Sequence, residues 1–161
     1  MKRWAIAPVL ALAVLPMTGC EDILFDDPEH TYNGPSLVEF APVLPAGNYV
    51  RTITFTRTAT ANQNTSVRVN FITAQASNGV SGTITRVSTS TAVENTHYRF
   101  TSGANYTIAA GAYSVDVPIE VLSAGLTPGQ SVSLVLELTP GQGYDVSAKY
   151  RTFSLTLRRT T

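Results

Sequence analysis

The chain has 161 residues with 11 basic and 11 acidic side chains, so its formal net charge at pH 7 is zero. A balanced charge provides no positive field, which argues against nucleic acid as a partner. The chain has one cysteine, which excludes an internal disulfide framework. Without a leader of about 20 residues, the remaining length suits one domain.

The first residues have the pattern of a secretory signal peptide. Lys2 and Arg3 form a positive start, and Trp4 to Leu15 is an apolar run. The run is shorter than the roughly 20 residues that span a bilayer, and Pro16 disfavours a longer helix. The pattern therefore predicts a cleaved leader rather than a transmembrane anchor.

The segment Met17-Thr18-Gly19-Cys20 resembles the lipobox of bacterial lipoproteins, with Met17 in place of the usual leucine. The resemblance implies cleavage before Cys20, a diacylglyceryl thioether on its sulfur and acylation of the new N-terminus. Residues 1–19 are then the signal peptide, and the mature protein is held on the bacterial outer membrane by lipid on Cys20. The alternative is an ordinary signal peptide cut nearby, which would leave a free thiol.

Residues 20–35 are predicted to form an acidic tether between the lipid and the fold. Acidic side chains and two prolines dominate this stretch. Acidic residues soon after a lipidated cysteine resemble a surface-export signal of Bacteroidota-like lipoproteins. A solvated linker explains the same charges, and both interpretations stay open.

From Ser36 onward, apolar residues alternate with polar ones, which is typical of strands with one packed face and one solvated face. The clearest alternating runs are Val50–Thr58, Val67–Phe71, Val115–Val121, Ser131–Leu138 and Phe153–Arg158. Weaker candidates are Leu37–Ala41, Thr83–Ser88 and Tyr106–Ala109.

Glycine, proline and asparagine clusters separate these runs, and no segment has a good amphipathic helical pattern. Residues 36–161 are therefore predicted to form an all-β domain, an antiparallel immunoglobulin-like β-sandwich of about seven or eight strands. Pro118 indicates an edge strand or a bulge. The segment Ala74–Ser90 is expected to be an extended hairpin or a mobile loop.

The order of motifs in the second half resembles the Calx-beta-like, immunoglobulin-like domains of uncharacterised Bacteroidota surface lipoproteins. The resemblance rests on Ala92–Tyr98, Tyr106–Gly111, Val115–Val121, Leu134–Leu138 and Tyr150–Leu157. Proteins of this kind often accompany polysaccharide-uptake systems. Calcium-binding members carry acidic loops, whereas this chain has His97 where an aspartate often stands and no carboxylate in Ser123–Gly129. Because Ca²⁺ needs six to eight oxygen ligands and the Ser123–Gly129 loop lacks carboxylates, no metal site is expected.

Catalytic and cofactor signals are weak. The chain has only two histidines, His30 and His97, so one chain cannot supply a three-histidine zinc site. Glu94 and His97 are interpreted as a polar pair in a loop. No Gly-x-Ser-x-Gly elbow and no phosphate-binding glycine loop are present. No enzymatic activity and no cofactor are therefore expected.

Tyrosines are the candidate ligand contacts, because the ring is apolar and the tip is polar. Tyr113 and Tyr144 lie beside glycine-containing turns and are expected to be exposed, whereas Tyr98, Tyr106 and Tyr150 are expected to pack at strand ends. The leading hypothesis is a lipid-anchored envelope module without catalytic activity, which supports a surface complex or adhesion. The alternative is a glycan-binding accessory lipoprotein of a polysaccharide-uptake system. The surface of the outer membrane is the expected location, with its periplasmic face as the other option.

Overall fold

A computed structural model describes residues 32–43, 47–74 and 76–161. The predicted signal peptide, the lipobox with Cys20 and the tether up to residue 31 lie outside the described residues. Residues 32–161 form one compact unit. Among the described residues, no helix is long and apolar enough to cross a membrane.

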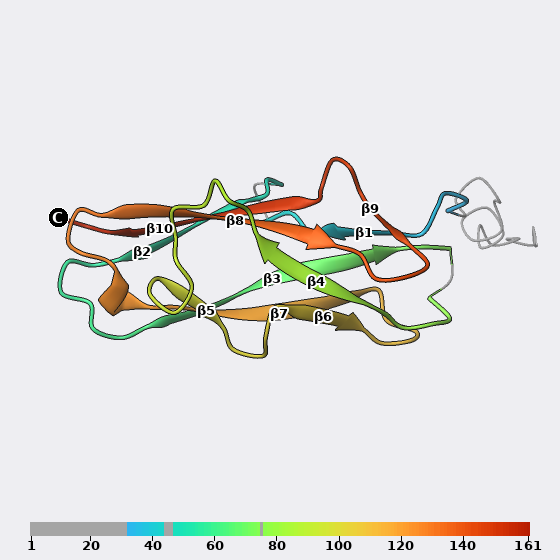
Figure 1. Cartoon of the computed structure of the whole chain (residues 1–161), viewed down its shortest axis with the longest axis horizontal. Helices are drawn as coiled ribbons and strands as arrows, with labels where there is room; N and C mark the ends of the chain where they lie inside the picture. Colours follow the sequence, from blue (N-terminus) through green and yellow to red (C-terminus); the bar gives the residue numbers. More distant parts are fainter. Residues whose placement is uncertain (1–31, 44–46, 75) are drawn as a thin grey trace, which may run out of the picture. The chain divides into compact units, whose positions relative to one another are not determined.

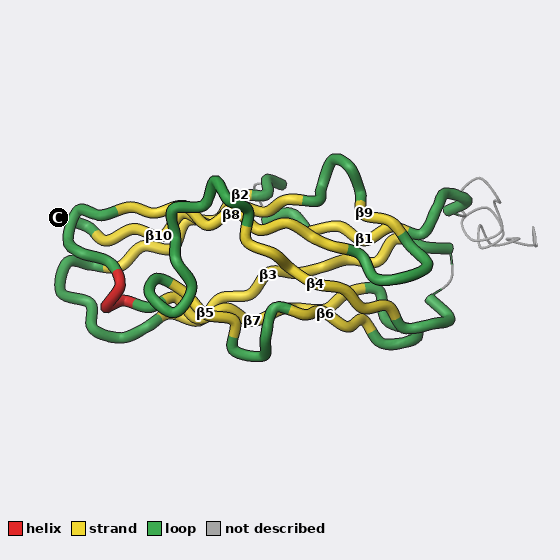
Figure 2. Tube along the Cα trace, viewed as in Figure 1, coloured by secondary structure: helices red, strands yellow, loops and turns green. Residues whose placement is uncertain are grey.

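The unit is a sandwich of two five-stranded sheets (Figure 1). The first sheet has the order β5 (Tyr98–Phe100), β7 (Ser114–Val121), β3 (Gln63–Ile72), β1 (Leu37–Phe40), β9 (Asp145–Val146). The second has the order β2 (Val50–Phe55), β10 (Thr152–Arg159), β8 (Ser131–Thr139), β4 (Val80–Arg86), β6 (Asn105–Ile108). A single 3₁₀ turn, Ser123–Gly125, is the one helical element of the described residues (Figure 2).

The all-β sandwich predicted from the sequence is confirmed, and the strand count is corrected to ten in the described residues. The two extra strands, β5 and β9, have three and two residues, too few for a pattern of alternation to be visible. Not every pair is antiparallel, because β1 runs parallel to β9 and β2 runs parallel to β10. The sheets are therefore mixed.

The parallel pairs arise because the chain changes sheets between β1 and β2. β1 pairs with β3 in the first sheet, and the next strand, β2, lies beside β10 at the edge of the second. β1 is only four residues long, whereas β3 has ten. One side of the Gln63–Arg68 half of β3 therefore has no strand neighbour.

The core lies between the sheets and consists of the side chains on the inward faces of the alternating strands. Fully buried examples are Phe40, Phe55, Leu134 and Leu155. At about 25 cal/mol per Å² of apolar surface removed from water, this burial is the main driving force for folding.

Two predictions about particular segments are refined. The segment Ala74–Ser90 contains β4, which pairs with β6 on one side and β8 on the other, so its centre is neither a hairpin nor a loop. Pro118 lies in β7, which has β3 on one side and the short β5 on the other. Pairing with β5 ends at Ile119, whose partner is Phe100, and the Thr101 N–H donates to the Pro118 carbonyl. Beyond this point β7 is an edge strand. Proline, which has no N–H to donate, is tolerated there.

Some loops lie at the two ends of the sandwich, and others lie along its flanks (Figure 1). The end at which β1 begins is called here the tether end. Ser36 is held there by a 3.1 Å hydrogen bond with the Thr73 hydroxyl, and its carbonyl accepts from Asp145 N–H. At the far end, the Ser123 hydroxyl donates to the Thr60 carbonyl and Arg159 donates to the Ala59 carbonyl.

Candidate functional site

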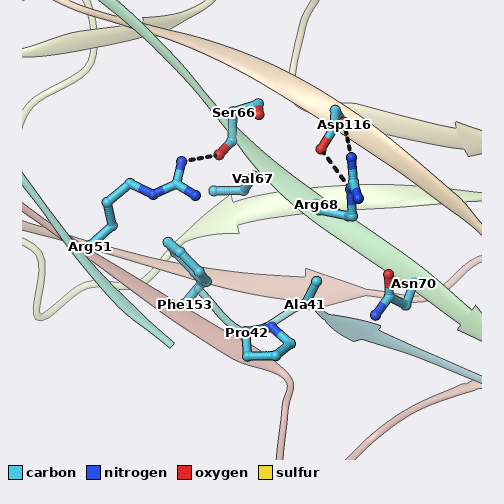
Figure 3. A pocket seen from close by; sticks show the side chains of 9 residues that line it. All are labelled: Ala41, Pro42, Arg51, Ser66, Val67, Arg68, Asn70, Asp116 and Phe153. Atoms are coloured by element: carbon cyan, nitrogen blue, oxygen red, sulfur yellow. Dashed lines mark hydrogen bonds and ion pairs between the residues drawn. The ribbon is translucent and has the colours of Figure 1, made fainter. Parts of the chain in front are cut away.

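A cavity of about 510 Å³ opens at the edge of the sandwich between β2 and β3. It is lined by Ala41, Pro42, Arg51, Ser66, Val67, Arg68, Asn70, Asp116 and Phe153. Its size falls within the range of roughly 300–1,000 Å³ that is common for small-molecule sites. We call it the edge cavity (Figure 3).

The edge cavity follows from the change of sheet described above. Pairing of β1 with β3 ends at Phe40 and Val69, and Ala41 adds one more hydrogen bond, 2.9 Å, from its N–H to the Arg68 carbonyl. Pro42 follows, and without an N–H it cannot continue the ladder. Beside the Gln63–Val67 part of β3, side chains therefore line the space that a neighbouring strand would otherwise fill.

Arg51 connects the two sheets across this space. Its Nη1 donates to the Thr65 hydroxyl at 2.7 Å and to the Ser66 carbonyl at 2.8 Å. Among the described residues, Nε and Nη2 of Arg51 have no acceptor. A half-buried guanidinium is thus fixed at one edge, and its other edge is free.

Arg68 and Asp116 form an ion pair at the other end of the cavity (Figure 3). Nε and Nη2 of Arg68 donate to the two carboxylate oxygens at 3.1 and 2.7 Å, and the residues are register partners on β3 and β7. The hydrogen bonds from Arg68 hold the pKa of Asp116 below its usual value, against a smaller opposing effect of burial, and the charge of Arg51 acts in the same direction as Arg68.

The floor of the cavity is apolar. Val67 and Phe153 are buried, and the Phe153 ring packs against Phe40 with 5.6 Å between centroids. Ala41 and Pro42 form a half-buried wall. Cations, a carboxylate and an amide thus face a small apolar surface, an arrangement that suits binding of a polar molecule with one apolar face.

Tyr113 is exposed, as predicted, with 54% of its surface accessible. The prediction that Tyr144 is exposed is wrong, because only 9% is accessible. The turn before it folds back, so that its hydroxyl accepts the Gly141 N–H at 2.9 Å and donates to the Ser81 carbonyl. Its ring packs edge-on against Phe71, at 6.0 Å.

The structure does not bring the two tyrosines into one site. Tyr144 lines a second cavity of about 290 Å³ at the tether end, together with Ser36, Thr73 and Asn78. Tyr113 lines neither of the two cavities. Whether either tyrosine contacts a ligand stays a prediction.

Four other tyrosines pack against neighbouring residues. Tyr98 and Tyr106 are buried, and Tyr150 stacks on Tyr49 with 4.8 Å between centroids. Lys149 lies 5.0 Å from the centroid of the Tyr150 ring. The expected packing of Tyr98, Tyr106 and Tyr150 near strand ends agrees with these contacts.

His97 has a structural environment. It is 8% accessible, and its Nδ1 accepts a 2.9 Å hydrogen bond from the Val93 N–H. Glu94 is exposed. In the part of the chain that the structure describes, no three side chains of His, Cys, Asp or Glu gather as metal ligands would.

The sequence of β2 contains a signal for the edge cavity. Alternation in β2 puts Arg51 on the same face as Ile53 and Phe55, and a charge on a packed face indicates either an edge strand or a site. The pairing of Arg68 with Asp116 depends on strand register, which the sequence does not reveal.

Comparisons with known proteins identify the fold. No family model matches the sequence, and no curated protein matches it. Among solved structures, the apo form of the Calx CBD1 domain aligns over 80% of this chain and all of its own length, with a TM-score of 0.55 and 14% identity.

The domain has a Calx-beta-like fold. A protein of unknown function from Bacteroides ovatus has a TM-score of 0.56 and 18% identity, and a second from the same organism has 0.52 and 14%. The alignments cover 76% of this chain but only 44% and 46% of those proteins, so the chain spans less than half their length. The Calx-beta-like fold recognised from the sequence is confirmed, and proteins from a Bacteroides species are among the structures that share it.

Proposed function

We propose that this protein is a lipid-anchored interaction module of the bacterial cell envelope, which supports a surface complex or adhesion without catalysing a reaction. The observation that carries the proposal is the lipobox-like Met17–Cys20, which comes shortly before a β-sandwich with its own core. Two acyl signals on one residue give stable anchoring.

The way in which the chain joins the sandwich supports a tethered arrangement. Ser36 is fixed at the tether end, through the Thr73 hydroxyl and the Asp145 N–H. The far end and the flank with the edge cavity are separate from the segment at which the chain enters the sandwich. Binding partners are expected on these surfaces.

Crosslinking in intact cells, followed by capture in mild detergent, tests the interaction role. The proposal predicts that envelope proteins or polysaccharide are recovered with the wild type and are lost with Cys20→Ser, which keeps the fold but removes the lipid. Recovery of the wild-type chain alone would contradict it.

Glycan binding is the second candidate, and the mixed polar and apolar lining of the edge cavity favours it. It predicts retention on at least one polysaccharide. Retention that is lost with Tyr113→Ala and kept with Tyr113→Phe would place the contact at the exposed tyrosine, whereas retention that Tyr113→Ala leaves unchanged would place it elsewhere on the domain. No retention across a broad glycan panel would contradict this candidate.

A further inference from the structure

We propose that the edge cavity binds a carboxylated sugar of an acidic polysaccharide, with its carboxylate on the Nε–Nη2 edge of Arg51. The inference deepens the glycan-binding candidate and does not depend on lipidation of Cys20. It assigns a site that is separate from Tyr113, which lines neither cavity.

Arg51 is prepared for a carboxylate. The two hydrogen bonds from Nη1 to Thr65 and Ser66 fix the plane of the guanidinium, and they leave Nε and Nη2 together on the opposite edge. Two parallel N–H donors match the two oxygens of a carboxylate. Because the side chain is already ordered, binding does not have to restrict it further.

The charges around the cavity leave Arg51 without a full partner. The only lining carboxylate is Asp116, and both of its oxygens accept hydrogen bonds from Arg68. Asp116 therefore compensates Arg68, and the lining retains one excess positive charge at Arg51. An anionic ligand would neutralise this charge.

The contacts disfavour an added peptide strand. An extended peptide that paired with β3 here would need the backbone carbonyls of Ser66 and Arg68 as acceptors. The Ser66 carbonyl already accepts from Arg51, and the Arg68 carbonyl already accepts from the Ala41 N–H. The guanidinium thus blocks the edge along which a strand would bind.

The rest of the lining suits a sugar ring. Asn70 and Asp116 lie across the cavity from Arg51 (Figure 3). Asn70 hydrogen-bonds to Glu39 and Asp116 accepts from Arg68, and the remaining lone pairs of their oxygens can accept from hydroxyl groups. Pro42, which is half-buried, lies between Arg51 and Asn70 and can pack against the C–H face of a ring, and the buried Phe153 completes the apolar floor. Planar polar groups at both ends and an apolar floor match a molecule with hydroxyls, a carboxylate and one apolar face.

Calorimetric titration of the purified protein in mild detergent tests the inference, with oligogalacturonate or oligoglucuronate as the probe. The same oligomers with their carboxylates reduced to alcohols are the matched ligands, and acetate tests whether a carboxylate alone is enough. Arg51→Lys keeps the charge but loses the paired donors. Arg57→Gln, which changes an exposed arginine of the loop after β2, is the control.

At least one uronate oligomer should bind, and its reduced form should bind about tenfold or more weakly. Arg51→Lys should weaken binding about tenfold as well, whereas Arg57→Gln should have no effect. If neither uronate binds, if the reduced oligomer or acetate binds equally well, or if Arg51→Lys leaves affinity unchanged, the inference is wrong.

Chemical-shift mapping of the wild-type protein tests the site without depending on whether a variant folds. Amide chemical shifts of Arg51, Ser66 and Phe153, which line the cavity away from Tyr113, should move on addition of the uronate. Shifts confined to Tyr113 and its neighbours would overturn this site while leaving glycan binding intact. Loss of all glycan binding would overturn both proposals, and the interaction module would still be tested by crosslinking.

Discussion

The hydroxyl groups of Tyr106 and Tyr144 meet inside the sandwich, with 3.3 Å between their oxygens. Tyr106 comes from β6, and Tyr144 comes from the loop between β8 and β9. The pair also reaches the Thr139 and Ser81 carbonyls, so it ties this loop to the second sheet. Burial, followed by the contact with Tyr144, raises the pKa of Tyr106, which keeps its hydroxyl neutral.

Tyr144→Phe should lower the free energy of unfolding by about 1–3 kcal/mol, because the Ser81 carbonyl and the Gly141 N–H lose their partner. Urea denaturation measures the change. Tyr113→Phe is the control and should alter stability little, since this side chain is exposed. Equal effects of the two changes would contradict the buried role of Tyr144.

Gly82→Ala should also destabilise the domain. Gly82 is the register partner of Tyr106, and a Cβ atom at Gly82 would overlap the Tyr106 hydroxyl and the Thr139 carbonyl. Gly103→Ala is a useful comparison, because Gly103 has a φ of +83° but open space around it and should cost only about 1–2 kcal/mol. A smaller loss of melting temperature for Gly82→Ala than for Gly103→Ala would argue against this packing.

Glu39→Gln should stabilise the protein at neutral pH. Burial raises the pKa of Glu39 more than the hydrogen bond from Asn70 lowers it. The folded protein therefore favours the protonated carboxyl, so stability is lost as pH rises through the pKa of the folded state. Denaturation curves between pH 3 and 8 should show the advantage of the variant disappearing at low pH. An advantage that grows towards low pH would contradict this assignment.

The ion pair of Arg68 with Asp116 should contribute little to stability. The two side chains are 56% and 47% accessible, and exposed pairs are worth about 0–1 kcal/mol. A double-mutant cycle with Arg68→Gln and Asp116→Asn, measured by urea denaturation, should give a coupling within this range that shrinks in high salt. A coupling of several kcal/mol that salt leaves unchanged would show a structural role instead of a site available to ligand.

The long strands were predictable from the sequence because their burial follows their alternation. Val67, Val117, Leu134 and Leu155 all lie on inward faces, as their spacing indicates. The pattern also favoured a sandwich over a helical domain. Alternation depends only on local sequence, which is why it succeeded here.

Features that depend on contacts between distant residues were not predictable. The two residues of β9 are a strand only because they lie beside β1, and the parallel partner of β2 comes from the last strand of the chain. Tyr144 was expected at the surface because of its neighbouring glycines, but the turn directs its hydroxyl inward to Ser81. The edge cavity likewise forms from the residues after β1 and from β2, β3, β7 and β10, whose register the sequence does not contain.

Lipidation of Cys20 is the central claim of the proposed function, and the mass of the protein extracted from membranes tests it most directly. Lipidation requires a chain that begins at Cys20, is heavier than the peptide by its acyl groups and partitions into the detergent phase, whereas Cys20→Ser should lack the added mass. An unmodified wild-type chain in the aqueous phase, or equal masses of the residue-20 side chain and its attachments in wild type and Cys20→Ser apart from the O-for-S exchange, would show that Cys20 is not lipidated.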